Sequence, residues 1–316
     1  MARKQFSILG LGTFAILGIG TTAQILLMVV MTVLWPQWGG HPWGMWILTF
    51  VPLYLVAVPI GLLILRKVPA KPLERQSLKA GTFFVFAAVS VFMMYAGNLL
   101  GNLVTVLLQL IPGIAAENPI LSYAMDSSVL PKVLLMVILA PIIEEYIFRK
   151  VLIDRMHIYG EKLAVVTSAL MFGLFHGNLS QFFYAYALGL VFGYVYLKTG
   201  KLRYSICLHM LINLLGSVVG PFFLEKISVI YTMETMDLAA LEPVLPWLAA
   251  FGFYTFALVG TAVAGLVLLC IHKKHISFEP AELELPKETR FKTVYANVGM
   301  ILLVLACLAL TVLNTL

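Results

Sequence analysis

Charged residues are scarce in this chain. Only 11% of its 316 residues are Asp, Glu, Lys or Arg, whereas 61% are hydrophobic, and the mean hydropathy is +0.97. A soluble globular domain carries about 25% charged residues, so the composition excludes that class. We therefore expect an all-α fold, a polytopic bundle of transmembrane helices.

Cysteine is equally rare, and the three that are present, Cys207, Cys270 and Cys307, lie in apolar runs without metal-like spacing. This pattern excludes a disulfide framework and a cysteine-based zinc site. Basic residues outnumber acidic ones by 21 to 15, but they are scattered among short loops instead of forming one patch. Nucleic acid is therefore not an expected partner, and the lipid bilayer is.

Long apolar runs divide the chain into membrane segments. A helix needs about 20 residues to cross the hydrocarbon core of a bilayer, with a range of roughly 17–25. Two runs, 163–176 and 182–197, are short, and they predict either two crossings or a tilted or re-entrant hairpin with a buried polar tip. We expect eight to nine segments, the other seven near 8–34, 45–66, 81–111, 132–153, 203–222, 247–271 and 295–314.

The loops indicate how these segments are oriented. Lys and Arg are retained on the cytoplasmic side of a membrane. If the N-terminus is cytoplasmic, 19 of the 21 basic residues fall on that side, and only Lys132 and Lys226 do not. All five tryptophans then map to the opposite interface. The first run is too long for a signal peptide and has no convincing cleavage site, so we interpret it as an uncleaved span.

Two adjacent glutamates, Glu144 and Glu145, interrupt one of the apolar runs. An ionisable side chain at the centre of a spanning helix costs roughly 2.5–3.5 kcal/mol and usually marks a functional site. Arg149 follows Glu145 by one helical turn, so this pair can form an ion pair, whereas Glu144 points elsewhere. Glu144 is thereby a candidate general base, and Pro141 predicts a kink that opens space beside it.

Three further polar residues, His176, His209 and Asn213, lie in the apolar segments that follow. His209 and Asn213 are four residues apart and share one helix face, from which both could stabilise an oxyanion. Two histidines and a glutamate could instead bind zinc. Each residue alone is more often structural, yet their coincidence predicts one hydrated site. Because His176 would lie about 20 Å deep and Glu144 about 8–10 Å, helix 163–176 should tilt or begin below the surface.

Three motifs in series resemble those of the CPBP family of CAAX proteases and bacteriocin-processing enzymes. They are Glu144-Glu145-x-x-x-Arg149, Phe172-x-x-x-His176 and His209-x-x-x-Asn213, between about Lys132 and Gly220. The resemblance implies a cofactor-independent intramembrane glutamic endopeptidase. By this analogy Glu144 activates water with the help of His176, His209 and Asn213 stabilise the oxyanion, and Glu145, Arg149 and Phe172 support the site.

The same resemblance divides the chain into N-terminal helices (1–131), a catalytic core (132–222) and C-terminal helices (223–316). It implies a membrane-associated peptide or protein as substrate, a bacterial plasma membrane, and an active site towards the cytoplasmic half. Three other functions use the same residues: a zinc-dependent protease, a non-catalytic protein of bacteriocin immunity or membrane-partner binding, and a proton-coupled transporter. The sequence argues against the transporter, because it shows no paired broken helices of the kind typical of transporters.

Overall fold

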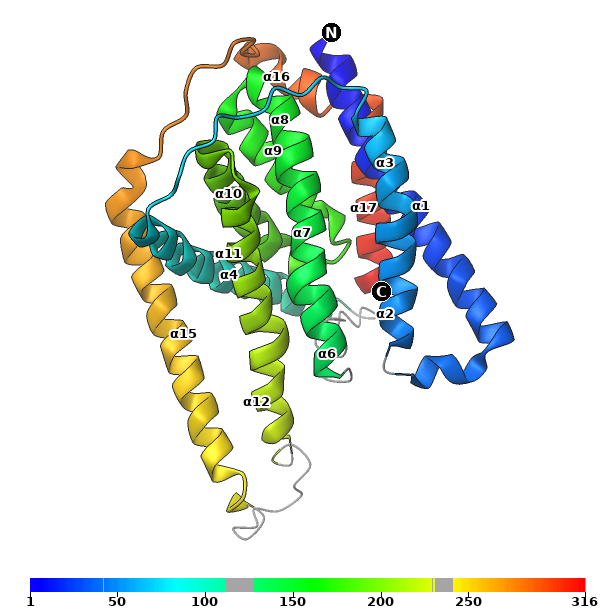
Figure 1. The fold of residues 1–316 in the computed structure, drawn as a ribbon, viewed down its shortest axis with the longest axis vertical. Coiled ribbons are helices and arrows are strands. Elements are labelled where there is room, and N and C mark those ends of the chain that lie inside the picture. Colours follow the sequence, from blue (N-terminus) through cyan, green and yellow to red (C-terminus); the bar gives the residue numbers. More distant parts are fainter. Residues whose placement is uncertain (42, 112–127, 229, 231–240, 316) are drawn as a thin grey trace.

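The computed structural model describes residues 1–41, 43–111, 128–228, 230 and 241–315. Every regular element in these ranges is helical, which confirms the all-α prediction (Figure 1). The N-terminal part contains α1 (Ala2–Leu34), η1 (Pro36–Gly40), α2 (Gly44–Phe50), η2 (Val51–Ala57), α3 (Val58–Leu65) and α4 (Ala80–Gln109).

The region with the polar motifs begins with one long helix, in which α-helical and wider π-helical turns alternate. The helices α9 and α10 follow, then a long helix made of α11, η6 and α12, and finally the C-terminal helices. The elements of the long helix are α6 (Val129–Pro131), η3 (Lys132–Leu139), α7 (Ala140–Glu145), η4 (Tyr146–Val151), α8 (Leu152–Met156) and η5 (His157–Tyr159). The remaining elements are α9 (Glu161–Phe175), α10 (Leu179–Thr199), α11 (Leu202–Leu214), η6 (Leu215–Val219), α12 (Gly220–Lys226), α15 (Leu245–His272), η7 (Lys273–His275), α16 (Lys287–Val294) and α17 (Val298–Thr315).

Five helices of the described chain are long and apolar enough to cross a membrane, and a sixth is gained if α16 and α17 count as one bent span. The chain is therefore a polytopic helical membrane protein. The sequence predicted eight to nine segments. The last of them, 295–314, corresponds to α17, and α16 precedes it at an angle of 62°. Asn297 stabilises the bend, because its side chain accepts from the backbone N–H of Met300.

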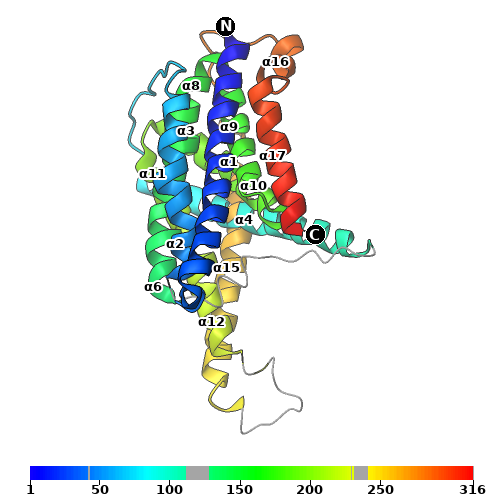
Figure 2. The same cartoon turned by 90° about the vertical axis from the view of Figure 1, so that its right-hand side faces the viewer.

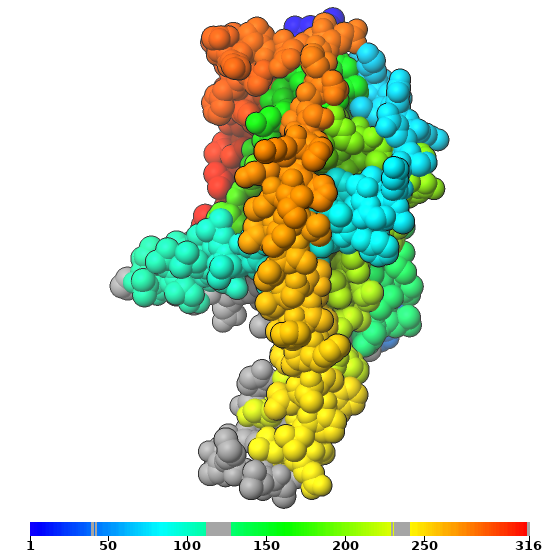
Figure 3. All heavy atoms as spheres, turned by 90° about the vertical axis from the view of Figure 1, so that its left-hand side faces the viewer, coloured from blue at the N-terminus to red at the C-terminus, as the bar shows by residue number. Residues whose placement is uncertain are grey.

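The first and last helices lie side by side, although they are far apart in the sequence. Figure 2 shows α1 between α3 and α17. The contact with α17 is close because two glycines face each other: a Cβ on Gly10 would lie 2.4 Å from the backbone of Gly299. On the far side of the molecule, α15 forms an outer column along the bundle (Figure 3), with most of its apolar side chains exposed for contact with lipid.

The helices α9 and α10 form the antiparallel hairpin that the two short runs predicted. Its tip is polar and enclosed: Asn178 caps α10 by accepting from the backbone N–H of Gln181, and Asn314 of α17 donates to the carbonyl of Gly177. Gly177 has φ +54°, a conformation that favours glycine. The polar tip is thus buried within the protein, as the re-entrant interpretation requires.

The third predicted span, α4, runs across the other helices instead of along them (Figures 1 and 2). It passes the tip of the hairpin at two glycines. A Cβ on Gly97 would meet the backbone of Tyr184 at 2.3 Å, and one on Gly101 would meet Ser180 at 2.8 Å. Because no side chain separates these backbones, α4 packs directly against the first turns of α10.

Three of the loops that the sequence placed in the cytoplasm meet at one end of the molecule. The backbone N–H of Leu283 donates to the carbonyl of Ile158, and the carboxylate of Glu282 pairs with Lys71 at 2.5 Å. The hydrogen bond from Lys71 holds the pKa of Glu282 below its usual range. The segment 276–286 therefore crosses the ends of α8 and α9 as a strap that joins these loops.

Candidate active site

The helix that carries the glutamates contains a widened turn just before them. The backbone N–H of Ala140 donates to the carbonyl of Leu135, five residues back, which is the π-helical pattern. The next bond in this pattern would run from residue 141 to Met136, but Pro141 has no N–H. Asn213 fills the gap, since its Nδ2 donates to the Met136 carbonyl at 2.8 Å. The predicted kink at Pro141 thus takes the form of a π turn that α11 completes.

Glu145 and Arg149 form the ion pair that their spacing predicts. Arg149 Nε lies 3.0 Å from Glu145 Oε2 and Nη2 lies 3.2 Å from Oε1, and neither side chain is exposed. Arg149 Nη1 also donates to Ser168 on α9, 3.1 Å away. A buried charge is tolerated when it is paired and hydrogen-bonded, so this arrangement fixes α9 against the glutamate helix.

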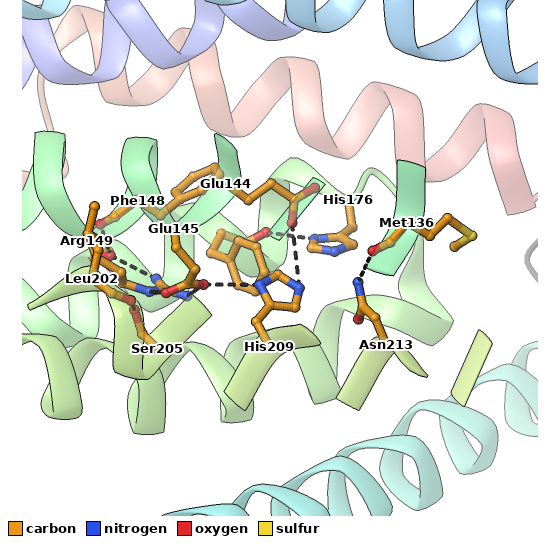
Figure 4. Close-up of polar contacts among 12 residues, drawn as sticks. Met136, Glu144, Glu145, Phe148, Arg149, His176, Leu202, Ser205, His209 and Asn213 are labelled. Atoms are coloured by element: carbon orange, nitrogen blue, oxygen red, sulfur yellow. Dashed lines mark hydrogen bonds and ion pairs between the residues drawn. The ribbon is translucent and has the colours of Figure 1, made fainter. Parts of the chain in front are cut away.

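His209 lies between the two glutamates (Figure 4). Its Nδ1 is 3.1 Å from Glu145 Oε1, and its Nε2 is 3.7 Å from Glu144 Oε2. A carboxylate accepts, so Nδ1 carries the proton that is donated to Glu145, and this bond sets the orientation of the ring. The Nε2 edge then faces Glu144 beyond direct hydrogen-bonding distance, which leaves a position at which one water molecule could contact both groups.

Phe172 is packed at the centre of the site. It is 2% exposed, and the Arg149 guanidinium lies 4.8 Å from its ring centroid. The rings of His176 and His209 meet it edge-on, with centroid separations of 4.9 and 5.7 Å. Phe172 therefore holds three polar residues in place through its apolar surface and its π face.

His176 ends α9 and faces Glu144 across the site (Figure 4). Its Nδ1 lies 2.8 Å from the carbonyl of Phe172, one turn back on the same helix. This bond directs the other edge of the ring into the site. The structure therefore brings Glu144, His176 and His209 together, and the 20% exposed side chain of Glu144 remains accessible.

The sequence predicted that Glu144 and His209 lie at a shallower depth than His176. The helices that carry Glu144 and His209 remove this difference, not helix 163–176. The glutamate helix continues to Met156, so Glu144 lies about 18 Å from its end, not 8–10 Å. The connection between α10 and α11 also lies lower in Figure 1 than the end of α8, which brings His209 deeper. The prediction that 163–176 must tilt or begin low was therefore unnecessary.

Several contact residues escaped the sequence reasoning, among them Ser168, Phe192 and Tyr54. Ser168 precedes Phe172 by one turn on the same face as His176, a signal that could have identified it. Phe192 of α10 stacks on His209 with a centroid separation of 5.4 Å, and nothing distinguishes it from other core aromatics in the sequence. Tyr54 of η2 donates its hydroxyl proton to Glu144 Oε1 at 3.0 Å, although it lies 90 residues before Glu144.

The zinc alternative needs two histidines and a glutamate. Both oxygens of Glu145 are engaged by Arg149, and His176 Nδ1 is directed at a backbone carbonyl. Within the described ranges, no three His, Cys, Asp or Glu side chains come together closely enough to hold a metal ion.

Comparisons with known proteins locate the same region. Residues 126–215 match the family model of Type II CAAX prenyl endopeptidase Rce1-like proteins. The "Putative membrane peptidase YdiL" of Bacillus subtilis (strain 168) is 28% identical over 184 residues, which is 55% of this chain and 70% of that protein. No solved structure matches.

The matched segment contains every motif residue on which the resemblance rests, from Glu144 to Asn213. The structure places these residues on α7, η4, α9 and α11 and at the C-terminal end of α9, and three of them, Arg149, His176 and His209, contact Phe172. Motifs, family match and relative agree: the chain is a membrane peptidase related to the Rce1-like type II CAAX prenyl endopeptidase family, whose model residues 126–215 match.

Proposed function

We propose that the chain hydrolyses peptide bonds of a membrane-associated peptide or protein, with Glu144 as the general base that activates water. One observation carries this proposal. Of the two adjacent glutamates, Glu145 is saturated by Arg149 and His209, whereas Glu144 is partly exposed and has Oε2 directed at His209 Nε2, 3.7 Å away. Only Glu144 has an oxygen free to take a proton from water.

In the proposed reaction, Glu144 takes one proton from a water molecule as the water oxygen attacks the carbonyl carbon of the substrate. The carbonyl π electrons move to oxygen, and hydrogen bonds from His209 and Asn213 stabilise this oxyanion. The Nε2 edge of His209, which faces Glu144, is the edge that reaches this oxyanion. When the oxyanion collapses, the C–N bond breaks and Glu144 returns its proton to the amine nitrogen. His176 holds the water on the opposite side.

The orientation in the membrane belongs to the same proposal. The N-terminus is cytoplasmic, and the strap 276–286 lies on that side with the ends of α8 and α9. Adding the glutamate helix, α9 and α10 to the six apolar spans gives nine membrane segments, in the bacterial plasma membrane. The convergence of basic loops at one end of the molecule supports this arrangement. In intact cells an impermeant thiol reagent should label Gln37→Cys but not Lys274→Cys; the reverse pattern would overturn it.

The substrate can be identified by comparing the membrane peptides of cells that carry the wild-type chain with those of cells that carry Glu144→Gln. This substitution removes the base and nearly preserves the shape of the side chain. Glu288→Gln, an exposed glutamate on α16, is the matched control. A peptide that disappears with the wild type and with Glu288→Gln, but accumulates with Glu144→Gln, is the substrate. Identical peptide profiles in all three, with a wild-type cellular phenotype for Glu144→Gln, would favour a non-catalytic binding protein.

A further inference from the structure

Tyr54 contacts the proposed general base from outside the family-matched segment. It lies in η2 of the second membrane helix and is 8% exposed. Its hydroxyl donates to Glu144 Oε1 at 3.0 Å. Through this hydrogen bond the N-terminal helices contribute a side chain to the site.

The surroundings of Tyr54 hold its ring in place. Phe50, one turn back, packs against it with a centroid separation of 5.0 Å, and Trp46 continues the row at 5.8 Å. The turn itself is widened: the N–H of Val58 donates to Leu53, five residues back, and Pro59 cannot supply the next such bond. Wide turns of this kind occur frequently at functional sites. The glutamate helix has the same combination of a π turn and a proline.

The hydrogen bond makes the two oxygens of Glu144 unequal. Oε1 accepts from Tyr54, whereas Oε2 faces His209 Nε2. We propose that Tyr54 is a positioning residue that anchors Glu144 through Oε1 and so selects Oε2 as the oxygen that takes the proton from water. This inference rests on the proposed function. It also means that the matched segment 126–215 does not contain the complete site.

The test measures the protonation of Glu144 directly, without a substrate. Dicyclohexylcarbodiimide modifies protonated carboxyl groups within membranes, and mass spectrometry reports its addition to Glu144 as a function of pH. Glu144→Gln identifies the modified site. Tyr54→Phe removes only the hydroxyl. The matched control is Tyr254→Phe, which removes a hydroxyl that donates to the Leu215 carbonyl away from the site. The full chain is used in native membranes.

A hydrogen bond donated to a carboxylate stabilises its ionised form by about 1.5–3 kcal/mol, which corresponds to about one to two pH units. We expect the midpoint of labelling to move up by that amount in Tyr54→Phe and to stay at the wild-type value in Tyr254→Phe. The other groups that face Glu144 are unchanged in both variants: His176, Tyr184 and His209.

A wild-type midpoint in Tyr54→Phe would overturn the inference. Cleavage of an internally quenched, prenylated peptide that ends in a CAAX sequence provides the second measurement. Tyr54→Phe should lower kcat about tenfold or more with little change in KM, and should move the acidic limb of the pH profile upward. If the midpoint shifts but the wild-type chain cleaves no such peptide and no peptide accumulates in cells with Glu144→Gln, the contact with Glu144 stands and the hydrolytic function fails. Equal thermal stability of the two Tyr→Phe variants shows that folding is not the cause.

Discussion

Glu145 and Arg149 are one helical turn apart and face each other with two hydrogen bonds, 3.0 and 3.2 Å long, in a region from which both side chains are fully excluded from solvent. This bidentate pair gives the two adjacent glutamates different surroundings. It holds Glu145 as a fixed anion that orients His209, and it leaves Glu144 as the carboxylate that faces the open part of the site.

Breaking this pair should destabilise the fold more than it affects the chemistry. Arg149→Met leaves the Glu145 carboxylate buried without its partner, which costs about 3–5 kcal/mol. We expect thermal unfolding of the detergent-solubilised protein to reveal that loss. Lys71→Met removes an exposed ion pair with Glu282 and should unfold close to the wild type. Similar unfolding of both variants would show that Arg149 has no special structural role.

Asn213 has a structural task that can be separated from any role at the oxyanion. Asn213→Leu leaves the Met136 carbonyl without its donor, and an unsatisfied buried acceptor costs about 1–3 kcal/mol. Pro141→Ala restores a backbone N–H at the position that the π turn requires. The double variant Pro141→Ala, Asn213→Leu should therefore recover part of the lost stability, and this coupling appears in a double-mutant cycle.

Cleavage by the same double variant distinguishes the two tasks. If Asn213 also stabilises the oxyanion, the recovered protein should remain about 10²–10³-fold slower than the wild type. Full recovery of the cleavage rate together with stability would restrict Asn213 to its bond with Met136.

Removal of metal ions should leave peptide cleavage unchanged. The charge of Glu145 is matched by Arg149, and the described His, Cys, Asp and Glu side chains form no three-ligand group. Cleavage is measured after dialysis against a chelator and again after addition of zinc. A loss on chelation that zinc restores would assign the water-activating role to a metal ion instead of to Glu144 alone.

Much of the site was predictable because helical spacing is regular. Residues four apart share a face, so the pairs Glu145 with Arg149, Phe172 with His176, and His209 with Asn213 followed from counting. Side-chain partners on other helices did not. Tyr54 lies in an apolar run with no polar neighbour, and only the packing of the second helix against the glutamate helix shows its contact with Glu144.

The helix lengths and directions were harder to predict than the motif. Hydropathy identified α4 as a span, but its direction across the bundle depends on Gly97 and Gly101, which allow close approach to the hairpin. The depth of Glu144 depended on where the helix ends. The sequence changes from apolar to charged near Arg149, whereas the helix continues to Met156 because η4 and α8 pack within the core. A change from apolar to charged residues therefore marks the membrane surface only where the residues are not packed against other helices.

The most direct test compares Glu144→Gln and Glu145→Gln for two properties, the rate of peptide cleavage and the stability of the fold in the same lipid. We expect Glu144→Gln to unfold like the wild type and to cleave at least about 10²–10⁴-fold more slowly, because only the general base is lost. Glu145→Gln should be destabilised, because Arg149 loses its buried counter-charge. Wild-type cleavage by a folded Glu144→Gln protein would contradict the assignment of Glu144 as the residue that activates water.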